Sequence, residues 1–237
     1  MKNIVTACAM ALAVVLPFGA IAGPYADFEN QLRDAYGHYR AALFQSNSGN
    51  AEATSKAIEA LSGKWAALES SWGTTPPPQY ADDPAYTKTL SAVSAVISQA
   101  RQEVAAGDLP TAHLTLEVLR DELGSMHDRN GVVSFSDRMN AYHAKMEEVL
   151  EHDLAALPDG GVGMLREDAA VLAYLAENIV RHPAPESADP AYAALVEAMM
   201  QSVEALQAAT RAGDAAAAKA AVGGLKVPYS KLFAKFG

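Results

Sequence analysis

The chain has 237 residues, of which 50% are hydrophobic, with a formal net charge of −10 at pH 7 and a pI of about 5.0. Such an acidic chain repels phosphate backbones, which disfavours nucleic acid as a partner, and it attracts divalent cations or basic proteins. Its single cysteine, Cys8, leaves residues 23–237 without a disulfide, a thiolate metal site or the Cys-x-x-Cys-His motif that attaches c-type haem.

Residues 1–22 have the features of a secretory signal peptide. A positive charge at Lys2 precedes a mostly apolar run over residues 4–20, and Ala20-Ile21-Ala22 fits the small-x-small rule for cleavage. We therefore predict cleavage near Ala22, export to the periplasm, and no membrane attachment of the mature chain.

Residues 23–237 predict an all-α fold. Helix-favouring residues are abundant and strand patterns are nearly absent. Apolar residues recur at alternating steps of three and four, which place one narrow stripe on one face of a helix. In chain order, the clearest stripes are Ile58, Leu61, Trp65, Leu68 and Trp72, then Leu109, Ala112, Leu116, Leu119, Leu123 and Met126, then Phe135, Met139, Tyr142, Met146 and Val149.

Turn-forming residues divide the chain into eight expected helices. Asp108 follows a glycine and is expected to cap the fourth helix, while Ser136 or Asp137 is expected to cap the fifth. The expected breaks lie at residues 46–49, 73–83, 107–108, 130–131, 158–163 and 183–190, and at 213–214, where Gly107-Asp108 is repeated.

The C-terminal quarter of the chain repeats an earlier stretch. Asp83-Pro84-Ala85-Tyr86 returns as Asp189-Pro190-Ala191-Tyr192, at an offset of 106 residues, and Ala106-Gly107-Asp108 returns as Ala212-Gly213-Asp214. Apolar positions follow the same offset without a gap. An internal duplication explains this pattern. It predicts two tandem up-down-up-down four-helix bundles, residues 23–131 and 132–237.

The layout of a helix, a linker, Asp-Pro-x-Tyr, a helix, Gly-Asp and a helix resembles the small soluble periplasmic b-type cytochromes, whose scaffold cytochrome c prime shares. The opening Ala26-Asp27-Phe28-Glu29-Asn30 is similar as well. This resemblance implies non-covalent haem b, held by a Met on the first helix and a His near the end of the fourth.

The haem ligands implied by the resemblance are only partly present. The His position falls on His127, but the Met position falls on or beside Leu32, which cannot ligate iron. In the second repeat the His position falls on Phe233, while Met139 lies near the Met position. Neither repeat carries both ligands, so a degenerate bundle with a different ligand is an equal alternative.

Two groups of side chains are candidates for a metal site. His113 and Glu117 are four residues apart on one helix, so both can ligate one ion. His127 ends one helix, and Met139 and His143 lie on the next. If these helices fold back as a hairpin, residues 127 and 139 are level, and imidazole with thioether suits copper. The alternative is that the Met residues fill the core.

Other polar residues carry no site prediction. Glu147, Glu148, Glu151 and Asp153 form an acidic patch that reads as a solvated helix face. No partner is evident for three further histidines, which are His38, His152 and His182.

No nucleophile motif, phosphate-binding loop or His-Glu-x-x-His zinc signature occurs in the sequence. We therefore predict a non-enzymatic periplasmic binding protein for a transition-metal ion or haem, serving metal handling or electron transfer. Copper and haem b are the candidate cofactors, and His127 is the residue on which both depend. The alternative is a structural or interaction module that binds a periplasmic protein partner and no small ligand.

Overall fold

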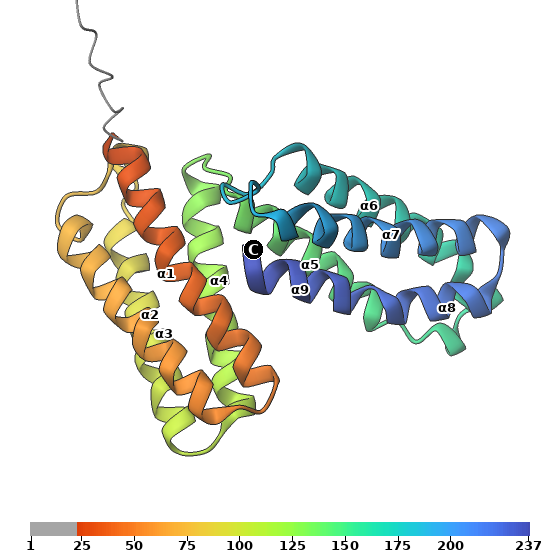
Figure 1. Ribbon diagram of the computed structural model, residues 1–237, viewed down its shortest axis with the longest axis horizontal. Helices are drawn as coiled ribbons and strands as arrows, with labels where there is room; N and C mark the ends of the chain where they lie inside the picture. Colours follow the sequence, from red (N-terminus) through yellow and green to blue (C-terminus); the bar gives the residue numbers. More distant parts are fainter. Residues whose placement is uncertain (1–22) are drawn as a thin grey trace, which may run out of the picture.

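The computed structural model describes residues 23–237, which are all-helical and contain no strand. The predicted signal peptide lies outside the described residues. Figure 1 shows two groups of helices that diverge from a common junction. We call α1–α4 the first half and α5–α9 the second half. None of the helices in residues 23–237 combines the length and the apolar character needed to cross a membrane.

In the first half, four helices surround one apolar core. Consecutive helices pack against each other, and α1 closes the ring by packing against α4. A short 3₁₀ turn, η1 (Pro78–Tyr80), lies between the second and third helices and brings Tyr80 fully into the core. The helices are α1 (Pro24–Asn47), α2 (Ala51–Trp72), α3 (Tyr86–Ala105) and α4 (Leu109–Arg129).

In the second half, the helices surround a separate apolar core. The last two helices together occupy the place of a fourth, because both pack against α5 and α7. The short 3₁₀ turns η2 (Leu154–Ala156) and η3 (Pro158–Gly161) connect the first two helices. The helices are α5 (Phe135–Leu150), α6 (Val162–Arg181), α7 (Pro190–Ala212), α8 (Ala215–Gly224) and α9 (Lys226–Phe236).

The break at Leu225 differs from the single helix expected there. Pro228 has no backbone N–H to donate to the carbonyl of Gly224, and its ring clashes with that carbonyl in a continuous helix. Gly223 and Gly224 also lower the helix propensity on the N-terminal side of the break. The chain therefore ends α8 and begins α9 at this point.

One predicted helix cap is confirmed by the structure, and another lies at a different residue. Asp108 caps α4 by accepting a hydrogen bond from the backbone N–H of Thr111 (3.1 Å), as predicted. The cap of α5 is Ser134, not Ser136 or Asp137. Ser134 accepts from the N–H of Asp137 (3.1 Å), whose carboxylate accepts from the N–H of Ser134 in return (2.6 Å). This reciprocal pair forms a capping box.

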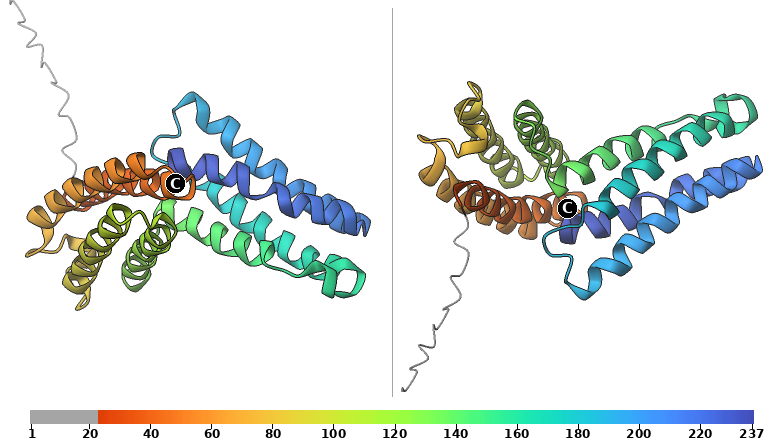
Figure 2. Two further views of the ribbon diagram at one scale, coloured as in Figure 1. Left: turned by 90° about the horizontal axis from the view of Figure 1, so that it is seen from below. Right: turned by 90° about the horizontal axis from the view of Figure 1, so that it is seen from above.

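The two halves meet along α1, where α9 packs against it (Figure 2). Arg33 donates to the carbonyl of Phe236 at 3.0 Å, and Arg40 donates to the carbonyl of Gly237. On the α5 side, Asn140 donates to the hydroxyl of Tyr36 at 3.1 Å. These polar contacts give the junction between the halves a defined geometry.

Candidate metal centre

Three of the predicted metal ligands line one cleft between the halves. His113 and Glu117 project from α4, and His143 projects from α5, into a cleft of about 860 Å³. The Nε2 atom of His113 is 3.8 Å from Glu117 Oε1, and its Nδ1 is 2.9 Å from Ser46 Oγ. The prediction that His113 and Glu117 are neighbours is correct, but 3.8 Å makes their contact a loose one.

His143 presents a neutral imidazole to this cleft. Burial, reinforced by the charge of Arg120, lowers the pKa of His143 to about 4. Its Nδ1 atom is buried and has no hydrogen-bond partner. His143 therefore has a free ligand atom, but in the described chain neither it nor His113 belongs to a group of three His, Cys, Asp or Glu residues whose ligand atoms lie within 4.8 Å of one another.

His127 lies in a different, smaller pocket. It is 4% exposed, and its Nδ1–H donates to Asp137 Oδ2 at 2.7 Å, which leaves Nε2 as the free nitrogen. Burial alone lowers the pKa of His127, but the hydrogen bond and charge of Asp137 outweigh it and hold the pKa above its ordinary value. The same contact holds the pKa of Asp137 below its ordinary value, against the effect of burial. The imidazole also stacks on Tyr80, with ring centroids 6.3 Å apart.

The pocket at His127 does not fit a haem. Leu32 lines it with His127, so the position expected to hold the second iron ligand carries a hydrocarbon side chain. The pocket has a volume of about 210 Å³. Pockets for drug-sized ligands occupy roughly 300–1,000 Å³, and haem is larger than most such ligands.

Met139 lies inside the second apolar core and is completely buried there. The hairpin considered from the sequence does not form, because α4 and α5 do not pack along their length. Met139 therefore fills the core, while the contact that α5 makes with His127 comes from Asp137 in its first turn.

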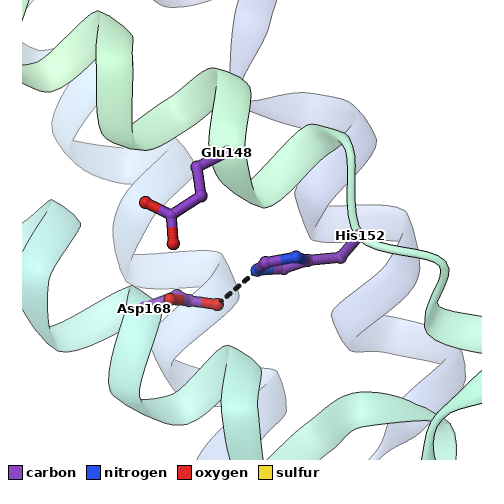
Figure 3. A group of neighbouring side chains, drawn as sticks. All are labelled: Glu148, His152 and Asp168. Carbon is purple, nitrogen blue, oxygen red and sulfur yellow. Dashed lines mark hydrogen bonds and ion pairs between the residues drawn. The ribbon is translucent and has the colours of Figure 1, made fainter.

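A third group of side chains was not predicted. Glu148 on α5, His152 just after α5 and Asp168 on α6 converge as shown in Figure 3. One ligand atom from each residue lies within 4.8 Å of the other two, and within residues 23–237 no other group of three or more such residues does so. His152 Nε2 is 3.0 Å from Asp168 Oδ2. We call Glu148, His152 and Asp168 the acid–histidine site.

A lysine already contacts both carboxylates of this site. Lys145 Nζ is 2.7 Å from Asp168 Oδ1 and 2.9 Å from Glu148 Oε1. Asp168 is only 6% exposed, so its charge requires a close cation or hydrogen-bond donor. Two carboxylates and one ammonium leave the cluster with a surplus negative charge.

The sequence contains part of the signal for this site. Glu148 and His152 have the same spacing of four residues as His113 and Glu117, a spacing that would place both on one side of a continuous helix. No partner of His152 is evident from the sequence, and the structure provides one, Asp168 on the next helix. Asp168 itself could not be identified, since its position depends on how α5 packs against α6.

Comparisons of the chain with protein-family models, with curated proteins and with solved structures give no match. The function is therefore inferred from the geometry and chemistry of the cleft, the His127 pocket and the acid–histidine site.

Proposed function

We propose that the protein is a non-enzymatic binding protein for a divalent transition-metal ion, which Glu148, His152 and Asp168 ligate. The observation that carries this proposal is that ligand atoms from three residues on two helices converge within 4.8 Å. The His113–Glu117 pair and His127 each lack this convergence.

The ligand types favour a particular class of ion. Zinc sites use imidazole nitrogen at about 2.0–2.1 Å and carboxylate oxygen at about 2.0–2.2 Å. Two ligands of one tetrahedral zinc ion therefore lie roughly 3.3–3.6 Å apart, so donors as much as 4.8 Å apart would have to approach each other by up to about 1.5 Å. One imidazole with two carboxylates suits Zn(II), Fe(II) or Mn(II), whereas Cu(I) prefers the sulfur ligands that this site lacks.

The cellular setting is part of the proposal. The signal-like residues 1–22 support export to the periplasm, where the protein would serve metal handling. The offset of 106 residues, together with the two separate cores, supports an origin by duplication of a four-helix bundle. On this proposal, the bundle of the b-type cytochrome kind has lost its haem site in both copies.

Metal titration of the chelator-treated protein tests the proposal. We expect Zn(II) to bind with a dissociation constant below about 10 μM, measured by isothermal titration calorimetry. Asp168→Asn and His152→Ala should each weaken binding at least about tenfold. His182→Ala is the matched control, because His182 is an exposed histidine at the end of α6 that contacts only the carbonyl of Asn178.

Two further variants distinguish the acid–histidine site from the metal sites predicted from the sequence. His127→Ala and His143→Ala should bind Zn(II) as tightly as the unmodified protein. If His127→Ala loses binding and His152→Ala does not, the ion is bound at His127. If no tested ion, among Zn(II), Mn(II), Co(II) and Cu(II), binds more tightly than tens of micromolar, the interaction-module alternative is favoured. Haem added under the same conditions should produce no stoichiometric Soret band.

A further inference from the structure

Lys145 bridges the two carboxylates of the acid–histidine site. Its ammonium nitrogen contacts one oxygen of Asp168 and one of Glu148, at 2.7 and 2.9 Å. The other oxygen of Asp168 is engaged by His152. Both oxygens of Asp168 therefore already have partners, and a metal ion that binds Oδ1 of Asp168 and Oε1 of Glu148 takes over the contacts made by Lys145.

From this geometry we infer that Lys145 is an internal counter-cation, and that a divalent ion binds the acid–histidine site by displacing its ammonium group. This inference rests on the proposed function, because it concerns the same three ligands. An ammonium and a divalent ion cannot share the two carboxylates at contact distance, since like charges a few ångströms apart repel each other. Binding is therefore an exchange of one cation for another.

The position of Lys145 allows this exchange. Lys145 lies one helical turn before Glu148 on α5, and its side chain is 16% exposed, so part of it already reaches solvent. Lysine carries a compact charge on a flexible four-carbon stem, which can rotate into water without moving the helix. Glu148, at 58% exposure, is also free to reorient around an incoming ion.

The exchange gives the metal-free protein a specific property. Without Lys145, the buried carboxylate of Asp168 would retain only His152 as a close partner, and an uncompensated buried charge is strongly destabilising. Lys145 therefore keeps α5 and α6 joined when no metal is bound, and lowers the affinity for the metal by competing with it. A monovalent ion offers no gain in charge over the ammonium, so the exchange selects for divalent ions.

Lys145→Met tests the inference, because it keeps the aliphatic stem and removes the charge. We expect Lys145→Met to bind Zn(II) about tenfold more tightly than the unmodified protein in calorimetric titrations. The control is Lys226→Met, since Lys226 makes an ion pair of the same kind with Glu147 on α5 (3.1 Å) but contacts no residue of the site. Its Zn(II) affinity should not change. Should Lys145→Met fail to fold, Lys145→Gln serves in the same assay.

A second measurement requires no substitution. Displacement frees the Lys145 amine, so its rate of acetylation, followed by mass spectrometry of the unmodified protein, should rise when Zn(II) is added. The rate at Lys226 should not. Circular dichroism melting adds a further contrast, since metal-free Lys145→Met should melt below the unmodified protein and recover on addition of Zn(II).

The outcomes separate this inference from the proposed function. Equal or weaker Zn(II) binding by Lys145→Met, with the unmodified protein binding normally, overturns the competition and leaves the metal site intact. Binding by Lys145→Met alone shows that the ammonium blocks the site and is not displaced, which overturns the exchange and, for the unmodified protein, the proposed function. If neither protein binds, both are overturned.

Discussion

The two halves of the molecule fill their cores differently. Buried aromatic rings contact one another in both halves: Phe28 meets Tyr80 edge-on at 5.2 Å in the first, and Tyr142 stacks on Tyr229 at 5.5 Å in the second. The difference lies in the methionines, since the second core contains three fully buried ones, at positions 139, 146 and 199, and the first core contains one, Met126. Methionine adapts its shape to irregular gaps, whereas rigid rings require one arrangement.

The halves also differ in how regular the chain is. Glycines with positive φ at Gly49 and Gly107 end helices of the first half in single tight turns. In the second half the chain takes three positive φ angles in succession, at residues 159–161, and breaks again at Leu225. The acid–histidine site lies beside the first of these irregular segments. Because His152 follows the end of α5, its side chain is released from the helical register and reaches Asp168 on α6.

Core substitutions should cause the largest difference between the halves in the free energy of unfolding. Trp65 is 2% exposed, and its indole N–H donates to Ser94 Oγ at 2.9 Å. Trp65→Ala should therefore lower the free energy of unfolding by about 3–5 kcal/mol in urea titrations. Trp72→Ala should cost less, because Trp72 is only partly buried. Met146→Ala should cost about 2–3 kcal/mol. A larger loss at Met146 than at Trp65 would contradict the view that the first core is the more rigidly packed.

The junction between the halves supplies the next prediction. Asp137→Asn removes the charge that holds the His127 imidazole and weakens the cap at Ser134, so it should cost about 2–3 kcal/mol. The raised pKa of His127 gives stability that is present below about pH 6.5 and is lost as pH rises through the raised pKa. The lowered pKa of Asp137 gives stability that is lost as pH falls through the lowered pKa. The loss on mutation should therefore be greatest between about pH 4 and pH 6.5 and smaller at pH 9.

Urea unfolding of the unmodified protein and Asp137→Asn across this pH range provides the measurement. The control is Asp82→Asn, because Asp82 is exposed and makes no hydrogen bond or ion pair through its side chain within the described chain. A mutational cost independent of pH would show that the pair is not ionised in the folded state.

Helix positions and core faces follow from the sequence because both depend on local periodicity. All five residues of the stripe from Phe135 to Val149 are buried, as are the residues from Ala112 to Met126 in the stripe of α4. The same periodicity cannot show how a helix end meets its neighbour. His127 pairs with Asp137, and His152 pairs with Asp168, through the packing of different helices. Of these four residues, only His127 could therefore be predicted as a ligand from the sequence.

His143, in the cleft between the halves, should make the stability of the protein depend on pH in the acid range. The lowered pKa of His143, about 4, means that the unfolded chain takes up a proton between about pH 6.5 and pH 4 that the folded protein does not. Stability should therefore fall by about 2 kcal/mol from pH 7 to pH 5 through this residue. Arg120, Lys226 and His113 oppose protonation of His143, while Glu147 favours it.

His143→Gln should reduce this loss of stability with acid, as measured by urea unfolding at pH 7 and pH 5. His38→Gln is the control, because His38 lies on α1 and does not line the cleft. If His143→Gln shows the same loss as the unmodified protein, His143 does not remain neutral in the folded cleft.

The smallest expected change in the free energy of unfolding concerns two helix caps at equivalent positions of the sequence repeat. Asp108 accepts from the N–H of Thr111 at 3.1 Å to cap α4, and Asp214 accepts from the N–H of Ala217 at 2.9 Å to cap α8. Replacing either by alanine should cost about 1 kcal/mol. The consequences should differ in extent, because α4 has 21 residues and α8 has 10. A helix as short as α8 is marginal without its tertiary contacts. Hydrogen exchange should therefore show lost protection throughout α8 in Asp214→Ala. In Asp108→Ala the loss should be confined to the first turn of α4. If the loss is confined to the first turn in both variants, α8 is held by its core contacts alone and not by its cap.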